Sequence, residues 1–354
     1  MKWKQIPLGN LITLQRGYDL FQQHRRDGDV PVVTSSGVTG YHEEAAAKGP
    51  GVITGRYGTI GEVHYIEGDY WPHNTTLFVK DFKGNHPLFI CYLLKSLNLA
   101  HQVSSGAVPG VNRNTLHPML VPDVPHPKQN RIADVLSTYD ELLENNRRRM
   151  GLLEESARQL YQEWFVRLRF PGHEHTSITH GLPEGWERKR VDQLCEIKGG
   201  KQIDNEMILD EGTHPVFGGN GIQGYTEGFT HEGFVIAFGR VGANCGSIHW
   251  AYRGAWINNN ASGLLSHSHP EVLLHHLLNF DFSSLRKGAA QPFIPNGVLS
   301  TVEFLDPPAR LKDNFCEFVR PMRLQQATFE RQNQKLRAAR DLLLPRLMSG
   351  EIAV

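Results

Sequence analysis

The sequence predicts an α+β fold in which two similar α/β modules are separated by an antiparallel coiled coil of two long helices, related by a pseudo-twofold internal repeat. Three observations predict this fold. The second half of the chain repeats the first, each half begins with short strand-like runs between turn residues, and each half ends in a helical heptad pattern. With 354 residues, 40% apolar and 21% charged, the chain is long enough for two or three globular domains and is not typical of a disordered protein.

The repeat has a nearly constant offset. Trp3, Leu14 and Gly17 recur 183 residues later as Trp186, Ile197 and Gly200. The offset is 184 where Gly55-Arg56-Tyr57-Gly58 recurs as Gly239-Arg240-Val241-Gly242, and it is 182 where Gly106-Ala107 matches Gly288-Ala289. Because the offset drifts so little across each half, we interpret the chain as a tandem duplication of about half its length.

The first part of each half reads as a mixed module of strands and one helix. Runs such as Val30 to Thr34, Gly51 to Thr54 and Thr76 to Val79 are short, rich in β-branched residues and bounded by turn residues, which is typical of strands. The runs Leu88 to Leu97 and Glu271 to Phe280 are longer, apolar and free of Gly and Pro. They predict one helix in each module.

The segments 128–166 and 309–349 change to a spacing of alternately four and three residues, which is the seam of a coiled coil. The second seam is weaker but keeps the same phase. The first seam is Ile132, Leu136, Tyr139, Leu143, Asn146, Met150, Leu153, Ala157, Leu160 and Trp164, and the second is Phe315, Val319, Met322, Gln326, Phe329, Asn333, Leu336, Arg340, Leu343 and Leu347.

Two such helices, each following a copy of the same module, most simply pair antiparallel. If their ends are flush, seam partners have residue numbers that sum to 479, and Asn146 then faces Asn333 as a buried polar pair that fixes the register. About 25 to 30 helical residues give a spacer of roughly 40 Å, close to the ~34 Å between half-sites one turn apart on DNA. The alternative is two amphipathic helices that each pack only on their own module.

Two local features predict where these helices begin. Pro321 predicts a break, with a short helix before it and the long helix starting there, because proline is tolerated in a first helical turn but not inside a helix. Ser137-Thr138 lies at the matching place in the first copy and predicts a helix cap.

The charge is unevenly distributed although the total is zero. Residues 1–127 carry a net +1, residues 128–170 carry +1, residues 171–308 carry −6 and residues 309–354 carry +4. No stretch approaches the ~20 apolar residues of a membrane span and the start lacks the apolar core of a secretory signal, so we expect a cytoplasmic protein. The single, scattered cysteines Cys91, Cys195, Cys245 and Cys316 predict reduced core residues.

The sequence resembles the specificity (S) subunits of type I restriction-modification systems. The resemblance covers the whole chain and lies in Trp3 to Gly17, Ile53 to Gly61, Trp71 to Leu77, Gln129 to Ala133 and Leu347 to Ile352. It implies target recognition domain 1 (1–127), helical spacer 1 (128–170), target recognition domain 2 (171–308) and helical spacer 2 (309–354), with each recognition domain reading one half of a split DNA sequence.

The same resemblance implies partners and a division of labour. In that family the chain binds double-stranded DNA and two modification subunits, which methylate adenine at N6 with S-adenosylmethionine. Restriction subunits translocate and cleave DNA with ATP and magnesium. The resemblance implies no catalytic residue, no metal and no cofactor in this chain.

The sequence contains several partial motifs for catalysis or cofactor binding, none of which is complete. Asp306-Pro307-Pro308-Ala309 lacks the aromatic residue that a DNA adenine methyltransferase stacks on the flipped base, and we interpret it as a linker into the helix. Gly219 to Gly224 fits G-x-G-x-x-G but does not open a helix, so we interpret it as a turn. The sequence contains no P-loop motif, and the His173-x-His175 and His267-x-His269 pairs lack further zinc ligands at useful spacing.

DNA contacts are the remaining chemistry. Arginine reads guanine and asparagine reads adenine in the major groove, while small polar and aromatic groups hold phosphates. The first candidates are Arg56-Tyr57 and Arg240, which lie between glycines; for each residue a fold-stabilising role is the alternative. The further candidates are His73, Asn74 and Thr75, then Asn258, Asn259 and Asn260, then Ser35, Ser36 and Asn220, with Arg113 and Asn296 as backbone contacts.

Charge limits what the chain can do alone. Specific DNA binding depends strongly on Lys and Arg neutralising phosphates, so we expect weak binding by the isolated chain and strong binding with modification subunits. The alternative function is a two-module protein–protein scaffold without base readout; a stand-alone methyltransferase is disfavoured by the missing cofactor motifs. The recognised bases and the length of the DNA spacer are not encoded in any motif.

Overall fold

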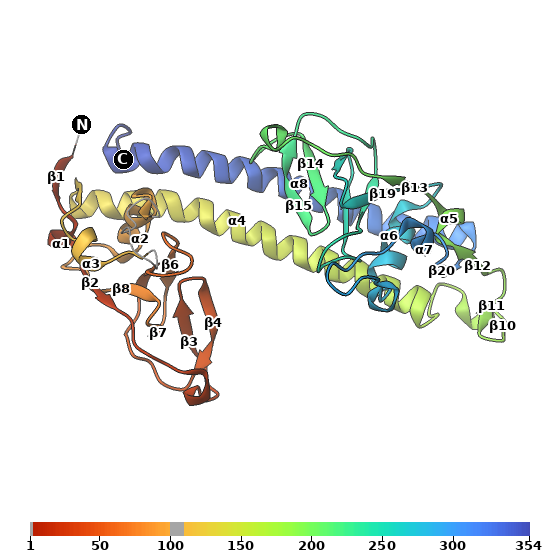
Figure 1. The fold of residues 1–354 in the computed structure, drawn as a ribbon, viewed down its shortest axis with the longest axis horizontal. Coiled ribbons are helices and arrows are strands. Elements are labelled where there is room, and N and C mark those ends of the chain that lie inside the picture. The colour runs from red at the N-terminus through yellow and green to blue at the C-terminus, as the bar shows by residue number, and fades with distance from the viewer. Residues whose placement is uncertain (1–2, 100–109) are drawn as a thin grey trace. The chain divides into compact units, whose positions relative to one another are not determined.

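The computed structural model describes residues 3–99 and 110–354, so the Gly106-Ala107 match of the repeat lies outside the described residues. The fold is α+β, with short strands followed by one long helix in each half (Figure 1). The chain forms two compact units. Unit 1 comprises Met1–Glu144 with Lys335–Val354, and unit 2 comprises Asn145–Gln334.

Unit 1 contains module 1, which is the described part of residues 1–127 and has three small sheets; module 2, in unit 2, is residues 171–308. The antiparallel pair β1-β9 combines Lys4–Pro7 with Leu120–Asp123. The four-stranded sheet has the order β2-β8-β5-β6, from Thr13–Arg16, Thr76–Asp81, Gly51–Gly55 and Val63–Ile66, and the three-stranded sheet has the order β4-β3-β7, from Gly37–His42, Val30–Thr34 and Trp71–Pro72. Its helices are α1 (Leu8–Leu11), η1 (Gln22–His24), α2 (Pro87–Ser96) and α3 (Arg113–Leu116).

Unit 2 contains module 2, which repeats each of these sheets in the same order. The pair β12-β20 combines Glu187–Arg190 with Glu303–Asp306. The four-stranded sheet is β13-β19-β16-β17, from Cys195–Gly199, Ala261–Ser266, Val235–Gly239 and Ile248–Ala251, and the three-stranded sheet is β15-β14-β18, from Gly221–Thr226, His214–Gly218 and Trp256–Ile257. The matching helices are α5 (Val191–Leu194), α6 (Pro270–Leu278) and α7 (Asn296–Leu299).

The shared topology confirms the internal repeat and the α+β fold class. Module 2 also contains the hairpin β10-β11 (Ile178–Thr179, Leu182–Pro183) and the turns η4 (His173–His175), η5 (Asn205–Met207) and η6 (Ser283–Leu285), of which η5 is the counterpart of η1 at an offset of 183. The predicted strand Val30 to Thr34 is β3, and the two predicted apolar helices are α2 and α6. Strands β5 and β16 are buried along their whole length, because one face packs on the module helix and the other on residues of the three-stranded sheet.

Each half ends in one long helix. Helix α4 (His126–Tyr161) continues into a π-helical turn, η3 (Gln162–Val166), and helix α8 spans Ala309–Ser349. In unit 1, Ile132 and Leu136 of α4 share a buried apolar cluster with Leu347 and Met348 of α8. Asp140 pairs with Arg340 (2.6 Å between Oδ1 and Nη1), so residue numbers fall along one helix as they rise along the other, and the helices are antiparallel.

In unit 2 the helices are also antiparallel. The buried side chains of Asn146 and Asn333 are hydrogen-bonded, with Nδ2 of the first 2.9 Å from Oδ1 of the second. Their numbers sum to 479, the value that flush helix ends require. The Gln326 amide donates to the Met150 carbonyl (3.0 Å), and the twenty seam positions of the two helices are all buried or half-buried. Pairing between α4 and α8 in both units contradicts the alternative in which each helix packs only on its own module.

Two predicted helix starts are wrong. Pro321 lies inside α8, which runs unbroken from Ala309 to Ser349. The proline is exposed, so water can satisfy the carbonyl that loses its N–H partner, and the buried Phe315 and Val319 before it hold the helix in place. Ser137 and Thr138 also lie inside a helix, α4, and their hydroxyls donate to the Asp134 carbonyl (3.1 and 2.8 Å) instead of capping a helix start.

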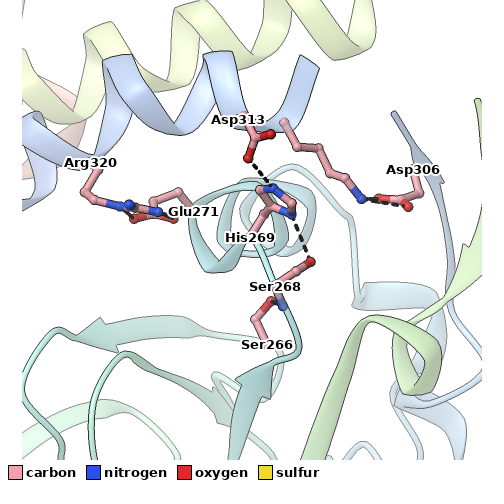
Figure 2. Close-up of polar contacts among 8 residues, drawn as sticks. Ser266, Ser268, His269, Glu271, Asp306, Asp313 and Arg320 are labelled. Carbon is pink, nitrogen blue, oxygen red and sulfur yellow. Dashed lines mark hydrogen bonds and ion pairs between the residues drawn. The ribbon is translucent and has the colours of Figure 1, made fainter. Parts of the chain in front are cut away.

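Charged side chains fasten module 2 to α8 (Figure 2). Glu271 of α6 pairs with Arg320 (2.8 Å) and His269 contacts Asp313 (3.0 Å). The Asp306 carboxylate, 4% exposed, lies 2.8 Å from the Lys312 ammonium and 2.7 Å from that of Lys189. The Asp306-Pro307 segment is therefore more than a linker, because its carboxylate is a buried anchor for the helix that follows.

The structure agrees with the prediction of reduced, buried cysteines. The four cysteines are free and buried, and burial raises the pKa of the Cys91 thiol to about 11 and those of Cys195 and Cys316 to about 12. Among residues 3–99 and 110–354, no helix is both long and apolar enough to cross a membrane.

Candidate nucleic-acid interface

The Gly-Arg-x-Gly segment of module 1 leaves strand β5 and is fixed by backbone hydrogen bonds on both sides. The N–H groups of Arg56 and Tyr57 donate to the Thr75 carbonyl (2.9 and 3.3 Å), and the Arg56 carbonyl accepts from Val111 (3.0 Å). Gly110 packs so closely on the Tyr57 ring that a Cβ there would lie 2.4 Å from it. The backbone of this loop is thus a rigid cradle whose side chains project from a fixed frame.

Module 2 builds the same cradle. The N–H groups of Arg240 and Val241 donate to the Asn260 carbonyl (2.9 and 3.2 Å), and the Arg240 carbonyl accepts from Ile294 (2.9 Å). Asn260 stands where Thr75 stands in module 1, at an offset of 185. The repeated glycine motif therefore encodes a repeated backbone geometry, and the side chains on it are what differ.

In module 1 the Arg56 side chain is available for a ligand. Its guanidinium lies over the Tyr57 ring, 4.6 Å from the centroid, and within residues 3–99 and 110–354 no acceptor hydrogen-bonds it. The ring packs on the arginine and limits its conformations, which lowers the entropy that the guanidinium loses on binding a base or a phosphate.

A cavity of about 460 Å³ brings Arg56 together with two further arginines. Arg113, in the first turn of α3, and Arg16, at the end of β2, both line it, with Gln15 and Asn112 as neutral polar groups. Its wall also contains Asp19, whose carboxylate accepts from Arg16 (3.1 Å) and from the Asn74 amide. Three guanidinium groups against one carboxylate give this cavity a net positive charge, as an anionic ligand requires.

The other predicted residues of module 1 belong mainly to the frame. Ser35 is buried in the β3–β4 turn, and its N–H donates to the Thr75 hydroxyl (3.4 Å). The His73 imidazole contacts the same hydroxyl (3.2 Å), and burial together with the nearby Arg25 charge lowers the pKa of His73. Ser36 is exposed on the turn. Of the predicted residues, Arg56 and Arg113 line the cavity and Asn74 contacts Asp19 of its wall, whereas Ser35, His73 and Thr75 hold its frame.

Of the three cavity arginines of module 1, module 2 keeps only the equivalent of Arg56, which is Arg240, while Gly199 and Asn296 stand at the places of Arg16 and Arg113. The Arg240 guanidinium is tied to the Asn259 carbonyl (3.0 Å), so it supports the loop. The Asn258 amide donates to Gln223 (2.8 Å), and Asn220 accepts from Asn244. Asn259 and Asn260 are exposed, and Asn296, which takes the place of Arg113, accepts from the Ser262 hydroxyl (2.8 Å).

Sequence reasoning missed six polar residues of these surfaces. They are Gln15, Arg16, Asp19 and Asn112 in module 1 and Gln223 and Asn244 in module 2. Arg16 directly precedes Gly17 of the repeat, which was a usable signal. Asn244 carries no signal, because only the fold brings it to the β14–β15 turn.

Comparison with known proteins shows which proteins the chain is similar to. Residues 1–154 match the model of the type I restriction modification DNA specificity domain. The chain is also 24% identical over 298 residues to the type I restriction enzyme MjaIX specificity subunit of Methanocaldococcus jannaschii, a match covering 75% of this chain and 69% of that protein. The chain is thus similar to type I specificity subunits, and its residues 1–154 match the model of their DNA specificity domain.

Two other specificity subunits match a shorter stretch of the chain or its fold alone. The putative type I restriction enzyme specificity subunit S.HindORF215P of Haemophilus influenzae is 29% identical over 139 residues, which covers 38% of this chain and 36% of that protein. The crystal structure of the type I restriction-modification system S subunit from M. genitalium matches with a TM-score of 0.66 at 15% identity, covering 98% of this chain and 96% of that one. At that identity the match supports the shared fold.

Proposed function

We propose that this chain is the DNA-reading subunit of a type I restriction-modification complex, in which each module recognises one part of a bipartite site. One observation carries the proposal: the same backbone cradle occurs in both modules, but its arginine lies at a cavity with two further arginines in module 1 and is tied to the loop, among several amides, in module 2. A duplicated frame with divergent side chains is what two readers of different base sequences need, since base identity is read by side-chain donors and acceptors.

The proposal assigns different roles to the two kinds of residue. In module 1, Arg56 reads a base edge or a phosphate and Arg113 contacts the DNA backbone. In module 2, the exposed Asn259 and Asn260 and the amide of Asn220 contact the second half-site, while Arg240 supports the loop. Arginine favours guanine and asparagine favours adenine in the major groove, so the two half-sites differ in the base pairs that matter most.

The chemistry of the complex is assigned to partner subunits. Two modification subunits that dock on the helices α4 and α8 methylate adenine with S-adenosylmethionine, and restriction subunits use ATP and magnesium, all in the cytoplasm. In this chain, the segment Gly219 to Gly224 forms the β14–β15 hairpin and leads into a strand. It therefore offers no helix N-terminus to a cofactor phosphate or carboxylate, and we assign this chain no catalytic step.

A gel-shift assay with and without modification subunits tests the proposal. We expect weak binding of a specific duplex by the chain alone, because its net charge is zero, and tight, sequence-dependent binding once modification subunits are added. If the assembled complex binds specific and scrambled duplexes equally, the chain is not a reader. In that case it acts as a protein–protein scaffold.

A further inference from the structure

A polar triad joins module 1 to both long helices. The Tyr92 hydroxyl of α2 donates to Asp140 Oδ2 (2.7 Å), and the Arg340 guanidinium of α8 lies 2.6 Å from Asp140 Oδ1. Asp140 is therefore an acceptor for two donors, one on its own module and one on the other helix. The side chains of Asp140 and Arg340 are 34% and 26% exposed, so the pair is partly shielded from water.

Module 2 has the same triad with every role reversed. Arg323 of α8 donates from Nη2 to His275 Nε2 of α6 (2.9 Å) and to Glu154 Oε1 of α4 (3.1 Å). Arg323 stands 183 residues after Asp140, and His275 stands 183 residues after Tyr92. At equivalent positions an acid has been replaced by a base, and the module residue that faces it has changed from a donor to an acceptor.

This reversal gives the two helices opposite charges at their contact. Helix α4 contributes the acids Asp140 and Glu154, and helix α8 contributes the bases Arg323 and Arg340. If helix α4 of a second copy took the place of α8, its Asp140 would lie where Arg323 lies in the native pair, because the two residues are equivalent in the repeat. This Asp140 would then face Glu154 of the first copy, so that two acids would meet.

Pairing of two α8 helices is also unfavourable. If α8 of a second copy took the place of α4, its Arg323 would lie where Asp140 lies in the native pair and would face Arg340 of the first copy. Arg323 is fully buried, and burial strengthens the repulsion between like charges because water screens them little. Both pairings of identical helices therefore bring like charges together, whereas pairing α4 with α8 brings opposite charges together twice.

We propose that these four charges are a pairing code, which makes α4 and α8 each other's partner and disfavours assembly of two identical halves. The surface that each helix presents fits the complementary half of this chain and not a second copy of itself. Two different modules are thereby kept in one particle. The code concerns helix pairing, so it can fail while the proposed DNA recognition holds, and the reverse is also true.

Cleavage of the folded chain between the halves tests the code. A specific protease site is inserted in the exposed segment 177–180, and the cleaved protein is equilibrated and weighed by native mass spectrometry. We expect the native sequence to give only the complex of the N-terminal half with the C-terminal half. The double variant Asp140→Arg with Arg340→Asp keeps the mixed pair complementary but also makes both identical-half pairings complementary, so we expect identical-half complexes to rise at least tenfold.

A matched control separates the effect of reversing the charges from the effect of weakening the helix pair. The double variant Asp140→Ala with Arg340→Ala removes the pair without reversing it, and we expect it to stay with the mixed complex. The proposal is overturned if the native sequence forms complexes of identical halves, or if the charge-reversed variant forms none. It is also overturned if such complexes rise equally in the alanine control. If the cleaved halves fail to stay associated, a double-mutant cycle on the intact chain decides, because additive effects of Asp140→Ala and Arg340→Ala on unfolding would also overturn it.

Discussion

The two modules share their strands and their backbone cradle, yet they are fastened to the long helices by different chemistry. Module 2 uses buried or partly buried charges, among them Asp306 with Lys312 and Glu271 with Arg320 (Figure 2). At the equivalent position of module 1, Asp123 is exposed, and the buried Gln129 joins helix and module through neutral bonds to the His86 N–H (2.9 Å) and the Asn85 side chain (2.7 Å).

This difference teaches which parts of a duplicated fold are constrained. The apolar pattern and the glycine-dependent turns define the strands and the cradle, and they are the same in both copies. Polar contacts at the helix junctions and on the cradle loops have diverged, because each needs only a local partner. The junction of module 2 therefore depends more on buried charge and on pH than that of module 1, where the neutral hydrogen bonds of Gln129 accompany the Tyr92–Asp140 contact.

The largest effect is expected from removing the buried carboxylate of module 2. Asp306→Asn leaves the Lys312 ammonium buried without its counter-charge, which costs about 3 to 5 kcal/mol in the free energy of unfolding. The matched variant Asp123→Asn, at the exposed equivalent position, is expected to cost less than about 0.5 kcal/mol. Urea unfolding of both variants measures the difference, and equal losses would remove the contrast between the junctions.

Acid is expected to destabilise unit 2 before unit 1. Burial lowers the pKa of His276 from its ordinary 6.5 to about 4, with Lys312 lowering it further and Asp306 opposing, and burial and Arg323 lower that of His275. As the pH falls, His276 is protonated in the unfolded chain before it is protonated in the folded chain, because its folded pKa is the lower one. The free energy of unfolding is therefore unaffected by His276 above pH 6.5 and falls by about 3 kcal/mol between pH 6.5 and 4.

Hydrogen exchange at several pH values measures this loss separately in the two units. The equivalent residues of unit 1, Tyr92 and Leu93, do not titrate in that window, so amides of α2 beyond its first turn, which His86 caps through the Phe89 N–H, should keep their protection while those of α6 lose it. The variant His276→Leu should flatten the pH dependence of α6. A parallel loss in both helices would count against the assignment.

A smaller effect is expected at the DNA surface of module 1. Arg56→Ala removes the guanidinium at the cavity and should weaken binding of the complex by about 1 to 3 kcal/mol, through one half-site only. Arg240→Ala is the matched change in module 2. Binding titrations with duplexes altered in either half-site measure both. If Arg56→Ala reduces discrimination equally at the two half-sites, module 1 does not read a separate sequence.

The smallest effect is expected from Arg113. As a contact to the DNA backbone it carries no base information, so Arg113→Ala should weaken all duplexes alike and lower the slope of log affinity against log salt by about 0.9. Asn114→Ala, the exposed neighbour, is the control. A change in base preference for Arg113→Ala would instead make it a reader.

Much of this fold could be predicted from the sequence, because duplication and periodicity are global patterns. The constant offset predicted two modules of one topology, and the heptad phase predicted the Asn146–Asn333 pair. Local rules failed at Pro321 and at Ser137-Thr138, where tertiary packing of the helix overrides the preference of single residues. The candidate surface was partly predicted: Arg56 and Asn74 follow motifs, whereas Asp19 and Asn244 are brought to it only by the fold.

The central claim is that two different modules of one chain read the two parts of a split DNA site. The most direct measurement is a genome-wide map of methylated adenines in a host that carries the modification subunits, with and without the gene for this chain. The account predicts a gene-dependent motif of two short sequences separated by unspecified bases, in which Arg56→Ala alters one part alone. A continuous motif, or methylation that does not depend on the chain, would contradict it.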